Sequence, residues 1–484
     1  MIAIDKNGGV CFEKIPDRSL VIAIDVGTTF SGVSYSLLEP RKKPRIQPVT
    51  RFAGQREGQG NSKVPSVVCY DQYGNFIAAG SEADPETNPL LSDMNGVRRA
   101  EWFKLRLRLP HLAADKRAEL QKLWLPPRPT EDEAHDEIED EVLLEIEGVG
   151  APIREPEPAR RETHFIPVTD DFKTPVQVFA DFLRYLFKSA KEYIIEAESN
   201  LDPTFSWTSV ERNTHFVLTH PNGWEEEQQS QMHEAAVAAG LVNMSATGER
   251  ITFLTEGEAN LHFCLEKNPN LQQERSGLLV VDCGGGTIDL SAYSWTEEGF
   301  REIASPGCLL QGSIFVTSRA RDYFKGRFKD SEFGSDDDVE AMAKAFDKPD
   351  GVKCMFSNPS IPYYVKFGGL RDTDRTFGIL GGKFRLEGAQ VAKFFEPAVN
   401  DIIDSIIVQR DSAKWNKFSI KIILLVGGFG SSGYLYTRLN DHFRPEGITV
   451  HRLDTAQLNK AVADGAVSCY LRRMAANRKE EEKH

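Results

Sequence analysis

The sequence predicts an α/β protein built as two similar lobes. Apolar runs of strand length alternate with segments of helical periodicity along most of the chain, as expected when helices cover sheets. Two distant segments, Leu20 to Ser36 and Gly277 to Tyr293, share one pattern: an apolar run, an aspartate, a glycine turn with a hydroxyl residue, and a second apolar run. A chain of 484 residues exceeds what one core holds. A repeated hairpin in such a chain indicates a duplicated fold.

The order of these segments sets the expected domain organisation. Lobe I is predicted over residues 20–276 and lobe II over residues 277–455, after an N-terminal arm over residues 1–19. A final helix over residues 456–471 returns to lobe I, and a charged tail follows over residues 472–484. Pro126 to Thr174 is rich in proline and acidic residues, so we expect most of it to be a mobile insertion in lobe I, with a candidate strand at Val142 to Ile146.

Each element is predicted from its local pattern. The first hairpin is followed by a basic loop at Arg41 to Arg56 and by a short strand pair that turns at Tyr73 to Asn75. Further strands are expected at His215 to Pro221, Ile251 to Thr255 and Lys421 to Val426, with a glycine-broken strand group at Tyr363 to Phe384. Helices are expected at Val97 to Leu109, from Pro175 onward, and at Trp224 to Gly240, Glu256 to Leu265, Ser331 to Asp350, Glu387 to Val408, Tyr434 to Phe443 and Ala461 to Leu471, with a turn and then a helix at Gly307 to Phe324.

Composition limits the class of protein. The net charge of -14, from 58 basic and 72 acidic residues, argues against a general binder of nucleic acid or anionic membranes. Seven scattered cysteines form no C-x-x-C pair, which favours reduced thiols in the cytosol or nucleus. His220, His233 and His262 stand alone and are interpreted as ordinary core or surface histidines. No signal peptide and no apolar run of membrane length is present, so an intracellular, soluble protein is expected.

The two repeated turns suit a polyphosphate. Gly284, Gly285 and Gly286 remove every β-carbon from one turn, so backbone N–H groups can approach an anion closely. Asp282 and Asp289 flank this turn, and like charges repel, so these acids need a cation between them and a phosphate. Magnesium is the natural candidate. The alternative is a glycine-rich hairpin with a capping aspartate, but the twin turn at Asp25 to Thr29 favours two turns that grip one ligand.

Other motifs carry less weight. Gly428 to Gly433 fits G-x-G-x-x-G between a strand and a helix, but too little chain follows for a dinucleotide domain. No Walker-type G-x-x-x-x-G-K-[ST], H-E-x-x-H or G-x-S-x-G motif occurs. A glycine turn that approaches another part of a nucleotide is the better interpretation of this stretch.

With its three glycine turns in this order, the chain resembles the nucleotide-binding domain of the seventy-kilodalton heat-shock chaperones, in the actin and sugar-kinase superfamily. I-D-V-G-T-T-F-S is similar to their first phosphate loop, V-D-C-G-G-G-T-I-D-L to the second and L-L-V-G-G-F-G to the adenosine loop. T-H-P, T-E-G-E-A-N and A-V-A-D-G-A-V resemble the connecting segments and the final helix. The resemblance implies a two-lobed actin-like ATPase fold with duplicated ribonuclease-H-like subdomains.

The resemblance also implies roles for particular residues. Asp25 and Asp282 would hold Mg²⁺ through water, Glu256 and Asp289 would orient water and metal, and Lys104 is the candidate phosphate-contacting lysine, in competition with three nearby arginines, Arg98, Arg106 and Arg108. The positions that would contact ATP or ADP are Gly27, Thr28, Thr29, Phe30, Gly284, Gly285, Gly286, Thr287, Gly312, Gly427, Gly428 and Phe429.

Three departures from the family pattern bear on function. The adenosine helix expected near Ala341 to Lys353 is broken by Pro-Asp-Gly, and the third loop has Phe429-Gly430-Ser431 where chaperones place Ser-Thr-Arg, so Phe429 is left as the face for a base. Gly257 stands where the chaperones carry a proline that helps to transmit the nucleotide state to their peptide-binding domain. Only a short tail follows Leu471, so the peptide-binding half is expected to be absent, as in a divergent branch of the family.

Together these patterns predict a protein that binds ATP with Mg²⁺, hydrolyses it slowly and closes its lobes on nucleotide, with an unknown protein partner or client. The output would be chaperone-like or regulatory. Two alternatives stay open: a nucleotide sensor or scaffold that binds without hydrolysis, and a small-molecule kinase of the same superfamily, which would need an acceptor pocket and a general base.

Overall fold

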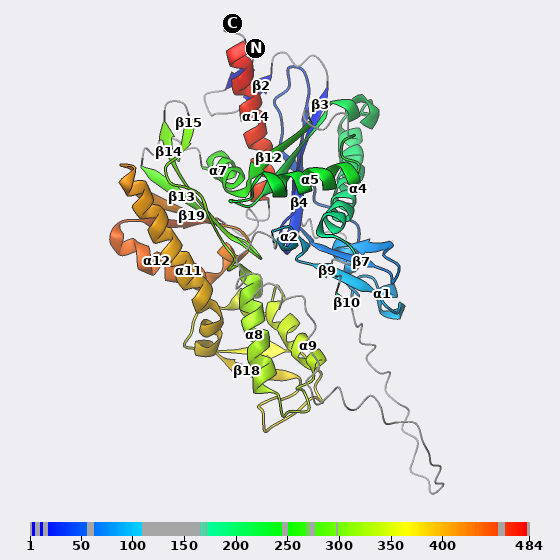
Figure 1. Cartoon of the computed structure of the whole chain (residues 1–484), viewed down its shortest axis with the longest axis vertical. Helices are drawn as coiled ribbons and strands as arrows, with labels where there is room; N and C mark the ends of the chain where they lie inside the picture. Colours follow the sequence, from blue (N-terminus) through cyan, green and yellow to red (C-terminus); the bar gives the residue numbers. More distant parts are fainter. Residues whose placement is uncertain are drawn as a thin grey trace.

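The computed structural model describes residues 2–4, 10–12, 18–55, 62–108, 166–167, 169, 172–243, 250–268, 271, 276–296, 299–453 and 460–481. Figure 1 shows two bodies side by side, which we call lobe I, with the early part of the chain, and lobe II, with the later part. The predicted strand at Val142 to Ile146 and most of the predicted insertion lie outside the described residues. The domain boundaries given above remain predictions.

Lobe I is built on a mixed sheet in the order β12-β11-β3-β4-β5. β3 and β4 form the first predicted hairpin and are antiparallel, whereas β11 and β12 run parallel to β3. β3 is buried along nearly its whole length, which explains its continuous apolar sequence. The strands are β3 (Ser19–Asp25), β4 (Phe30–Leu38), β5 (Gln47–Pro48), β11 (Thr214–His220) and β12 (Ile251–Thr255), with β6 (Val64–Pro65) also paired to β4.

Lobe II repeats this arrangement in the order β15-β14-β13-β19-β20. The second predicted hairpin, β13 with β14, is antiparallel, and β19 and β20 run parallel to β13. Each lobe therefore has a hairpin followed by two parallel strands, and the predicted duplicated α/β fold is confirmed. The strands are β13 (Gly277–Cys283), β14 (Ile288–Thr296), β15 (Gly299–Glu302), β16 (Gly307–Leu309), β19 (Ile420–Val426) and β20 (Thr449–Arg452), with β16 also paired to β14.

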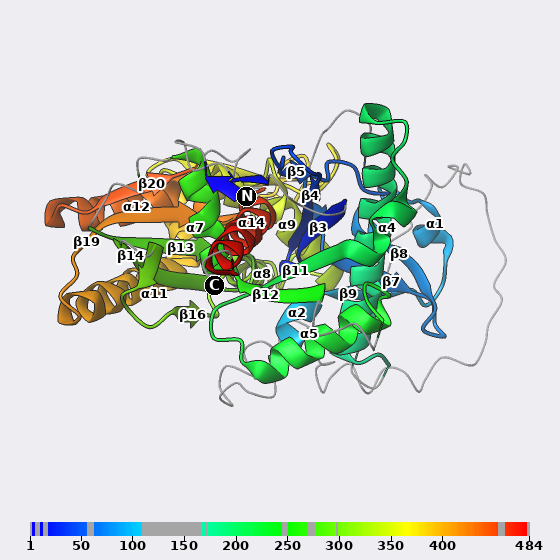
Figure 2. The ribbon, with the colours of Figure 1, turned by 90° about the horizontal axis from the view of Figure 1, so that it is seen from above.

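Two helices lie between the sheets of the lobes. α7 (Glu256–Lys267) buries Leu261 and Leu265 against the sheet of lobe II, while α14 (Ala461–Glu481) buries Val462 and Val467 against the sheet of lobe I. Figures 1 and 2 show α7 and α14 next to each other between the two sheets, and the two helices pack directly on one another. Because α7 follows a strand of lobe I and covers lobe II, it links the two bodies.

The remaining helices cover the outer faces and extend the lobes. In lobe I, α4 packs its phenylalanines into the core, beginning at a capping box formed by Thr174 and Gln177. In lobe II, α11 runs through the core that α8 and α9 complete. The helices are α1 (Leu90–Asp93), α2 (Phe103–Arg106), α4 (Pro175–Leu201), α5 (Glu226–Ala238), α8 (Ser313–Arg327), α9 (Asp336–Asp347), α10 (Val352–Met355), α11 (Gly388–Trp415) and α12 (Gly433–Phe443).

Small sheets form the ends of the lobes. One has the order β10-β9-β7-β8, and a separate hairpin joins β17 to β18. The segment Ile166–Pro167 from the predicted insertion pairs with β9 as β10. The strands are β7 (Val67–Tyr70), β8 (Phe76–Ala79), β9 (Arg98–Glu101), β10 (Ile166–Pro167), β17 (Pro362–Lys366) and β18 (Lys383–Glu387), and an N-terminal hairpin pairs β1 (Ile2–Ile4) with β2 (Val10–Phe12).

Two predicted elements differ from the structure. The helix expected at Val97 to Leu109 is wrong: Arg98–Glu101 is a strand that pairs with β7 and β10, and only Phe103–Arg106 is helical. Trp102, in the left-handed region with φ of 53°, separates the two pieces. The final helix is longer than predicted, since α14 continues past Leu471 to Glu481 through the Ala, Arg, Lys and Glu residues that favour helix.

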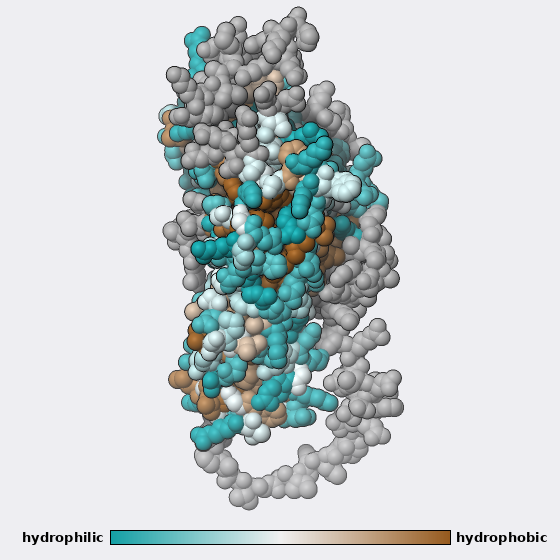
Figure 3. Space-filling model, turned by 90° about the vertical axis from the view of Figure 1, so that its left-hand side faces the viewer, coloured by the Kyte–Doolittle hydropathy of each residue, from teal (hydrophilic) through white to brown (hydrophobic). Residues whose placement is uncertain are grey.

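The surface shows how polar and apolar side chains are distributed. On the face that carries α11 and α12, hydrophilic and hydrophobic residues are interspersed (Figure 3). Among the described residues, no helix combines the length and the apolar composition needed to cross a bilayer.

Candidate functional site

The two phosphate-type turns meet each other. A β-carbon added to Gly285 would lie 2.5 Å from the Thr29 side chain, and one added to Gly286 would lie 2.7 Å from the Thr28 hydroxyl. The turn that follows β3 in lobe I and the turn that follows β13 in lobe II are thus in contact, although more than two hundred residues separate them in sequence. Any side chain at these glycines would push the turns apart, which explains the glycine run.

Three further predicted glycines complete this region. The backbone N–H of Gly312 donates to the carbonyl of Gly286 at 3.1 Å, so the start of α8 is fixed on the second turn. Gly427 has φ of +82°, and a β-carbon there would overlap a carboxylate oxygen of Asp282. Gly428 is exposed, with open space where its β-carbon would be. The third turn therefore lies beside the second, because β13 and β19 are neighbours in one sheet.

Four predicted acids lie around the joined turns. Asp25, Asp282 and Asp289 are buried, and the Glu256 side chain is 12% exposed. Burial, together with repulsion from Glu256, Asp289 and Asp25, raises the pKa of Asp282 well above its usual range. Burial and then Glu256 raise the pKa of Asp289 to about 7, although hydrogen bonds from Thr287 and the backbone of Asn222 oppose this. The groups around these carboxylates therefore do not fully offset their negative charge.

Lys104 is the predicted lysine that the structure brings to the site. Its Nζ lies 2.5 Å from Glu256 Oε1, and its side chain is buried. Burial alone would lower the pKa of Lys104, but attraction to Glu256 and Asp25 outweighs it and the pKa is raised. Glu256 is placed for this contact because it opens α7, where Thr255 caps the helix by accepting from the N–H of Glu258.

The competing arginines lie elsewhere. Arg98 stacks over the ring of Phe172 at 4.3 Å, and Arg106 belongs to α2 and interacts with other groups. Arg108 donates to Cys308 Sγ at 3.2 Å, in a contact between the lobes. Lys104, in contrast to Arg98 and Arg108, pairs with one of the predicted acids among the described residues.

Three site residues were not predicted from the sequence. Lys63 pairs with Asp25 Oδ2, Thr219 donates to Asp25 Oδ1 at 3.1 Å, and Ser66 donates to the carbonyl of Gly27 at 2.7 Å. Lys63 and Ser66 flank β6, which pairs with the start of β4 directly after the first turn. The only sequence signal for Thr219 is its place in T-H-P at the end of β11, a strand parallel to β3.

Two asparagines also hold the acids in place. Asn260 donates to Asp282 Oδ2 at 2.5 Å, and the backbone N–H of Asn222 donates to Asp289 Oδ1 at 2.7 Å. Asn222 also donates to Ser291 Oγ at 2.9 Å. A β-carbon on Gly257 would overlap Ser291 Oγ, so a side chain at this position would separate α7 from β14. Glycine therefore allows the close packing that keeps Glu256 beside the second turn.

The predicted base-binding side differs from expectation. Phe429 is buried, and its ring packs on Phe395 with centroids 6.0 Å apart inside the lobe II core. The expectation that this ring offers a face to a base is therefore corrected: the ring is part of the core. Phe30, in contrast, is 51% exposed at the start of β4. On the side predicted to bind the base, Gly427 and Gly428 contribute only backbone atoms.

Comparisons with known proteins decide the family. A family model described as Hsp70 protein matches residues 163–468, which is more than half of the chain. The chain belongs to the Hsp70 family. The match includes Glu256, Asp282, Asp289 and both glycine turns of lobe II, whereas Asp25 and Lys104 precede it.

The curated relatives of this Hsp70 chain are distant. It is 25% identical to "Chaperone protein dnaK" of Cyanidioschyzon merolae over 54% of the chain and 39% of that protein. It is 24% identical to "Mitochondrial-type heat shock protein 70" of Encephalitozoon hellem, over 61% of the chain and 45% of the relative, and 23% identical to "Chaperone protein DnaK" of Nitrosopumilus maritimus, over 54% and 37%. The chain thus spans less than half the length of the curated relatives it matches.

Proposed function

We propose that this Hsp70-family chain binds ATP with Mg²⁺ between its lobes, hydrolyses it slowly and closes on the nucleotide. One observation carries the proposal: two glycine turns from different lobes touch, and buried carboxylates and lysine ammonium groups surround the contact. Backbone N–H groups suit phosphate oxygens, acids suit a divalent cation, and lysines suit the charge that develops when phosphate is transferred.

The phosphate chain is assigned to the two turns. Gly285 and Gly286 supply backbone N–H groups, and the hydroxyls of Thr28, Thr29 and Thr287 supply further donors. The N–H groups of Gly27, Gly284 and Gly312 donate to Ser31 Oγ and to the carbonyls of Thr287 and Gly286, so these three glycines shape the turns around the phosphates. Opening the lobes separates the turns, admits a nucleotide and lets each turn take one side of the phosphates.

The acids fit a magnesium ion. Oxygen ligands around a hard cation that keeps its waters are the usual Mg²⁺ arrangement, and Asp25 and Asp282 are assigned to that water shell. The raised pKa of Asp282 supports this assignment, because its cause is burial together with three nearby acids whose charge a divalent cation would offset. When bound, the ion would neutralise negative charge on the phosphate oxygens.

The remaining groups are assigned to the attacking water. Glu256 and Asp289 orient it, and Lys104, held by Glu256 at 2.5 Å, reaches the γ-phosphate. Asp289, with a pKa of about 7, is suited to hold a proton at neutral pH. These groups would align the water with the phosphorus and stabilise charge as the bond to the leaving ADP breaks.

Single-turnover hydrolysis tests the ATPase proposal. Purified chain is mixed with radiolabelled ATP and Mg²⁺, and released phosphate is followed for the wild type, Asp25→Asn and Asp282→Asn. We expect each variant to lose at least tenfold in rate. Asp464→Asn is the matched control, because Asp464 on α14 is also buried but accepts from Ser34 of β4, outside the acid cluster. Equal rates in all four proteins would refute the proposal.

Nucleotide choice needs a separate measurement. Since the Phe429 ring is buried, stacking on it cannot select adenine. Calorimetric titration with ATP, GTP and CTP, each with and without Mg²⁺, compares the bases at constant phosphate. We expect similar affinities for the three bases, together with a strong loss when Mg²⁺ is removed.

A second function has one observation in its favour. Lys63 already pairs with Asp25, the carboxylate assigned to the metal's water shell. An ammonium group that stays there during binding would favour a nucleotide sensor that binds without hydrolysis. The single-turnover experiment separates the two, since a sensor binds ATP in the titration and releases no phosphate.

The output is proposed to be chaperone-like or regulatory. Three of the relatives carry "chaperone" in their names, and lobe closure is the change that a protein partner or client would sense. Pull-down with the chain loaded with ATP or with ADP, against the Asp25→Asn variant, tests whether any partner depends on nucleotide.

A further inference from the structure

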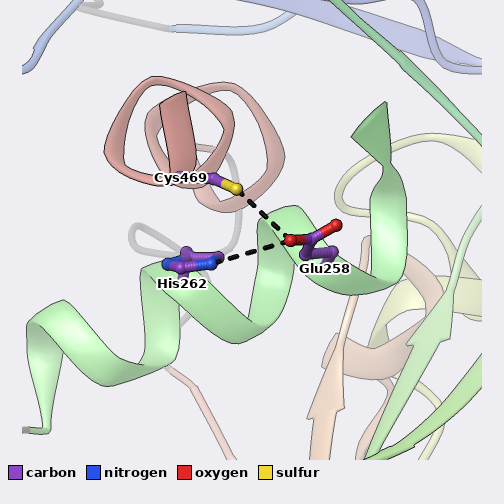
Figure 4. A group of neighbouring side chains, drawn as sticks. All are labelled: Glu258, His262 and Cys469. Atoms are coloured by element: carbon purple, nitrogen blue, oxygen red, sulfur yellow. Dashed lines mark hydrogen bonds and ion pairs between the residues drawn. The ribbon is translucent and has the colours of Figure 1, made fainter. Parts of the chain in front are cut away.

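A cluster of three metal-ligand side chains lies on the far side of α7 from the nucleotide residues. Glu258, His262 and Cys469 each present one ligand atom, and the three atoms lie within 4.8 Å of one another. Figure 4 shows the carboxylate of Glu258 between the imidazole of His262 and the thiol of Cys469. Glu258 Oε1 is 3.4 Å from Cys469 Sγ and 3.9 Å from His262 Nε2.

The fold fixes this juxtaposition. Glu258 and His262 are four residues apart on α7, so both project from one face of the helix. Cys469 comes from α14, one turn after Gly465. A β-carbon on Gly465 would overlap the carbonyl oxygen of Ala259, so the two helices cross almost backbone to backbone at that point. The close crossing brings the thiol to the other two side chains.

His262 directs its Nε2 toward the carboxylate of Glu258. Its Nδ1 is buried and has no hydrogen-bond partner among the described residues, and its Nε2 is beyond hydrogen-bond distance of Glu258. An imidazole nitrogen that lies beside a carboxylate without bonding to it can share a metal ion with that carboxylate.

We propose that Glu258, His262 and Cys469 form a site for Zn²⁺ that fastens α7 to α14. Bond lengths of about 2.0 to 2.3 Å around tetrahedral zinc place neighbouring ligand atoms about 3.4 to 3.6 Å apart. The oxygen–sulfur distance of 3.4 Å already fits. The oxygen–nitrogen distance of 3.9 Å is longer, and the nitrogen and sulfur atoms lie within 4.8 Å of each other, so the His262 side chain must move toward the other two ligands. A mixed sulfur, nitrogen and oxygen set favours zinc over magnesium or calcium, and water takes the fourth position.

Two changes accompany binding. Cys469 gives up its thiol proton to solvent, so one proton is released as the metal–sulfur bond forms. Arg473, which now contacts both carboxylate oxygens of Glu258 at 2.7 and 2.8 Å, must leave. Its side chain is 49% exposed, so the guanidinium can turn into water. The carboxylate and thiolate then balance the charge of the ion.

The test uses the full chain, reduced and freed of metal with a chelator, and Co²⁺ as a spectroscopic stand-in for Zn²⁺. We expect one equivalent of Co²⁺ to give a thiolate-to-cobalt charge-transfer band that Zn²⁺ abolishes. Cys469→Ser should remove this band, and His262→Gln should weaken Co²⁺ binding at least tenfold. Cys354→Ser is the matched control, because Cys354 is an exposed thiol outside the cluster, and it should leave the band unchanged.

A gain-of-binding variant guards against simple misfolding. Arg473→Gln removes the cation that competes for Glu258, so its affinity for Co²⁺ and Zn²⁺ should rise several-fold. Zn²⁺ should also raise the thermal midpoint of the wild type and leave that of Cys469→Ser unchanged. A band that survives in Cys469→Ser, or an affinity that does not rise in Arg473→Gln, would overturn the proposal. Nucleotide is absent throughout, so the result is independent of the proposed ATPase.

Discussion

Among the described residues, Lys63 and Lys104 each place a positive charge against the buried acids of the candidate site. Each ammonium group contacts one buried or largely buried carboxylate, Asp25 in the first case and Glu256 in the second. Taking either lysine away leaves an acid in a poorly hydrated place without its counter-charge, which is far costlier than removing an exposed pair. The two lysines therefore stabilise the fold and shape the site together.

Lys63→Met is predicted to make folding depend on Mg²⁺. Without metal, loss of the Asp25 partner should cost roughly 3 kcal/mol of unfolding free energy. With metal, the cation should replace the ammonium, so Mg²⁺ should raise the thermal midpoint far more in the variant than in the wild type. Lys42→Met is the control, since Lys42 forms an exposed pair with Glu39. The same Mg²⁺ response in all three proteins would show that Lys63 and the metal do not share Asp25.

Asp289→Asn is predicted to stabilise the chain at alkaline pH. The folded-state pKa of about 7 is above the usual value of 3.8, so the folded state holds the proton more tightly than the unfolded chain. The wild type should therefore lose stability as pH rises from about 4 to 7, by an amount on the order of 4 kcal/mol. The variant lacks this loss, and Asn still accepts from the N–H of Asn222. Thermal midpoints at pH 5 and pH 8 measure the difference.

At the level of elements, the sequence predicts those helices, turns and strands that nearby residues determine. Both hairpins, all three glycine turns and the starts of α4 and α7 follow from apolar runs, glycines and capping residues nearby in the chain. Arg98–Glu101 does not, because its strand exists through pairing with β7 and β10, and β10 is more than sixty residues away. Of the predicted helix over Val97 to Leu109, only Phe103–Arg106 is helical, because pairing with distant strands overrides the local sequence at Arg98–Glu101.

The candidate site also contains residues that the local sequence predicts and residues that it does not. Asp25, Asp282 and Asp289 are predictable because each adjoins a glycine turn within its own hairpin. Lys63 and Thr219 reach Asp25 from other strands, so only the sheet order reveals them. Phe429 shows the opposite error, since an exposed loop was expected and the ring packs into the core on Phe395. Side-chain direction depends on neighbours that the local sequence does not specify.

The close contact between α7 and α14 leads to a prediction about stability. Gly465→Ala should destabilise the chain by roughly 3 kcal/mol or more, because its β-carbon would overlap the carbonyl of Ala259 and force two core helices apart. Gly326→Ala is the matched control: Gly326 lies within α8 with open space around its β-carbon position, and alanine there should stabilise by about 0.5 to 1 kcal/mol. Urea unfolding of both variants gives the two free energies, and equal effects would contradict a close helix crossing.

At the scale of the whole molecule, the lobes touch at more than the phosphate turns. Lys348, after α9 in lobe II, lies 3.9 Å from Glu86 of lobe I, and Arg108 reaches Cys308 across the same divide. The Glu86 and Lys348 side chains are 76% and 57% exposed, so this pair contributes little stability. The contact between Glu86 and Lys348 can therefore open and close easily, and a ligand between the lobes would decide how often it forms.

Zero-length carbodiimide cross-linking therefore reports on closure in the unmodified protein. The reagent joins a carboxylate to an amine in contact, so Glu86 and Lys348 should form an amide when the lobes are closed. We expect Mg²⁺ with ATP to raise the yield of this cross-link several-fold over the nucleotide-free chain, measured by mass spectrometry. Asp336 and Lys325, 2.9 Å apart within lobe II, provide the internal control, and their yield should not change. If both cross-links respond equally to ATP, nucleotide does not drive the lobes together, and closure would have to be abandoned as the output of the site.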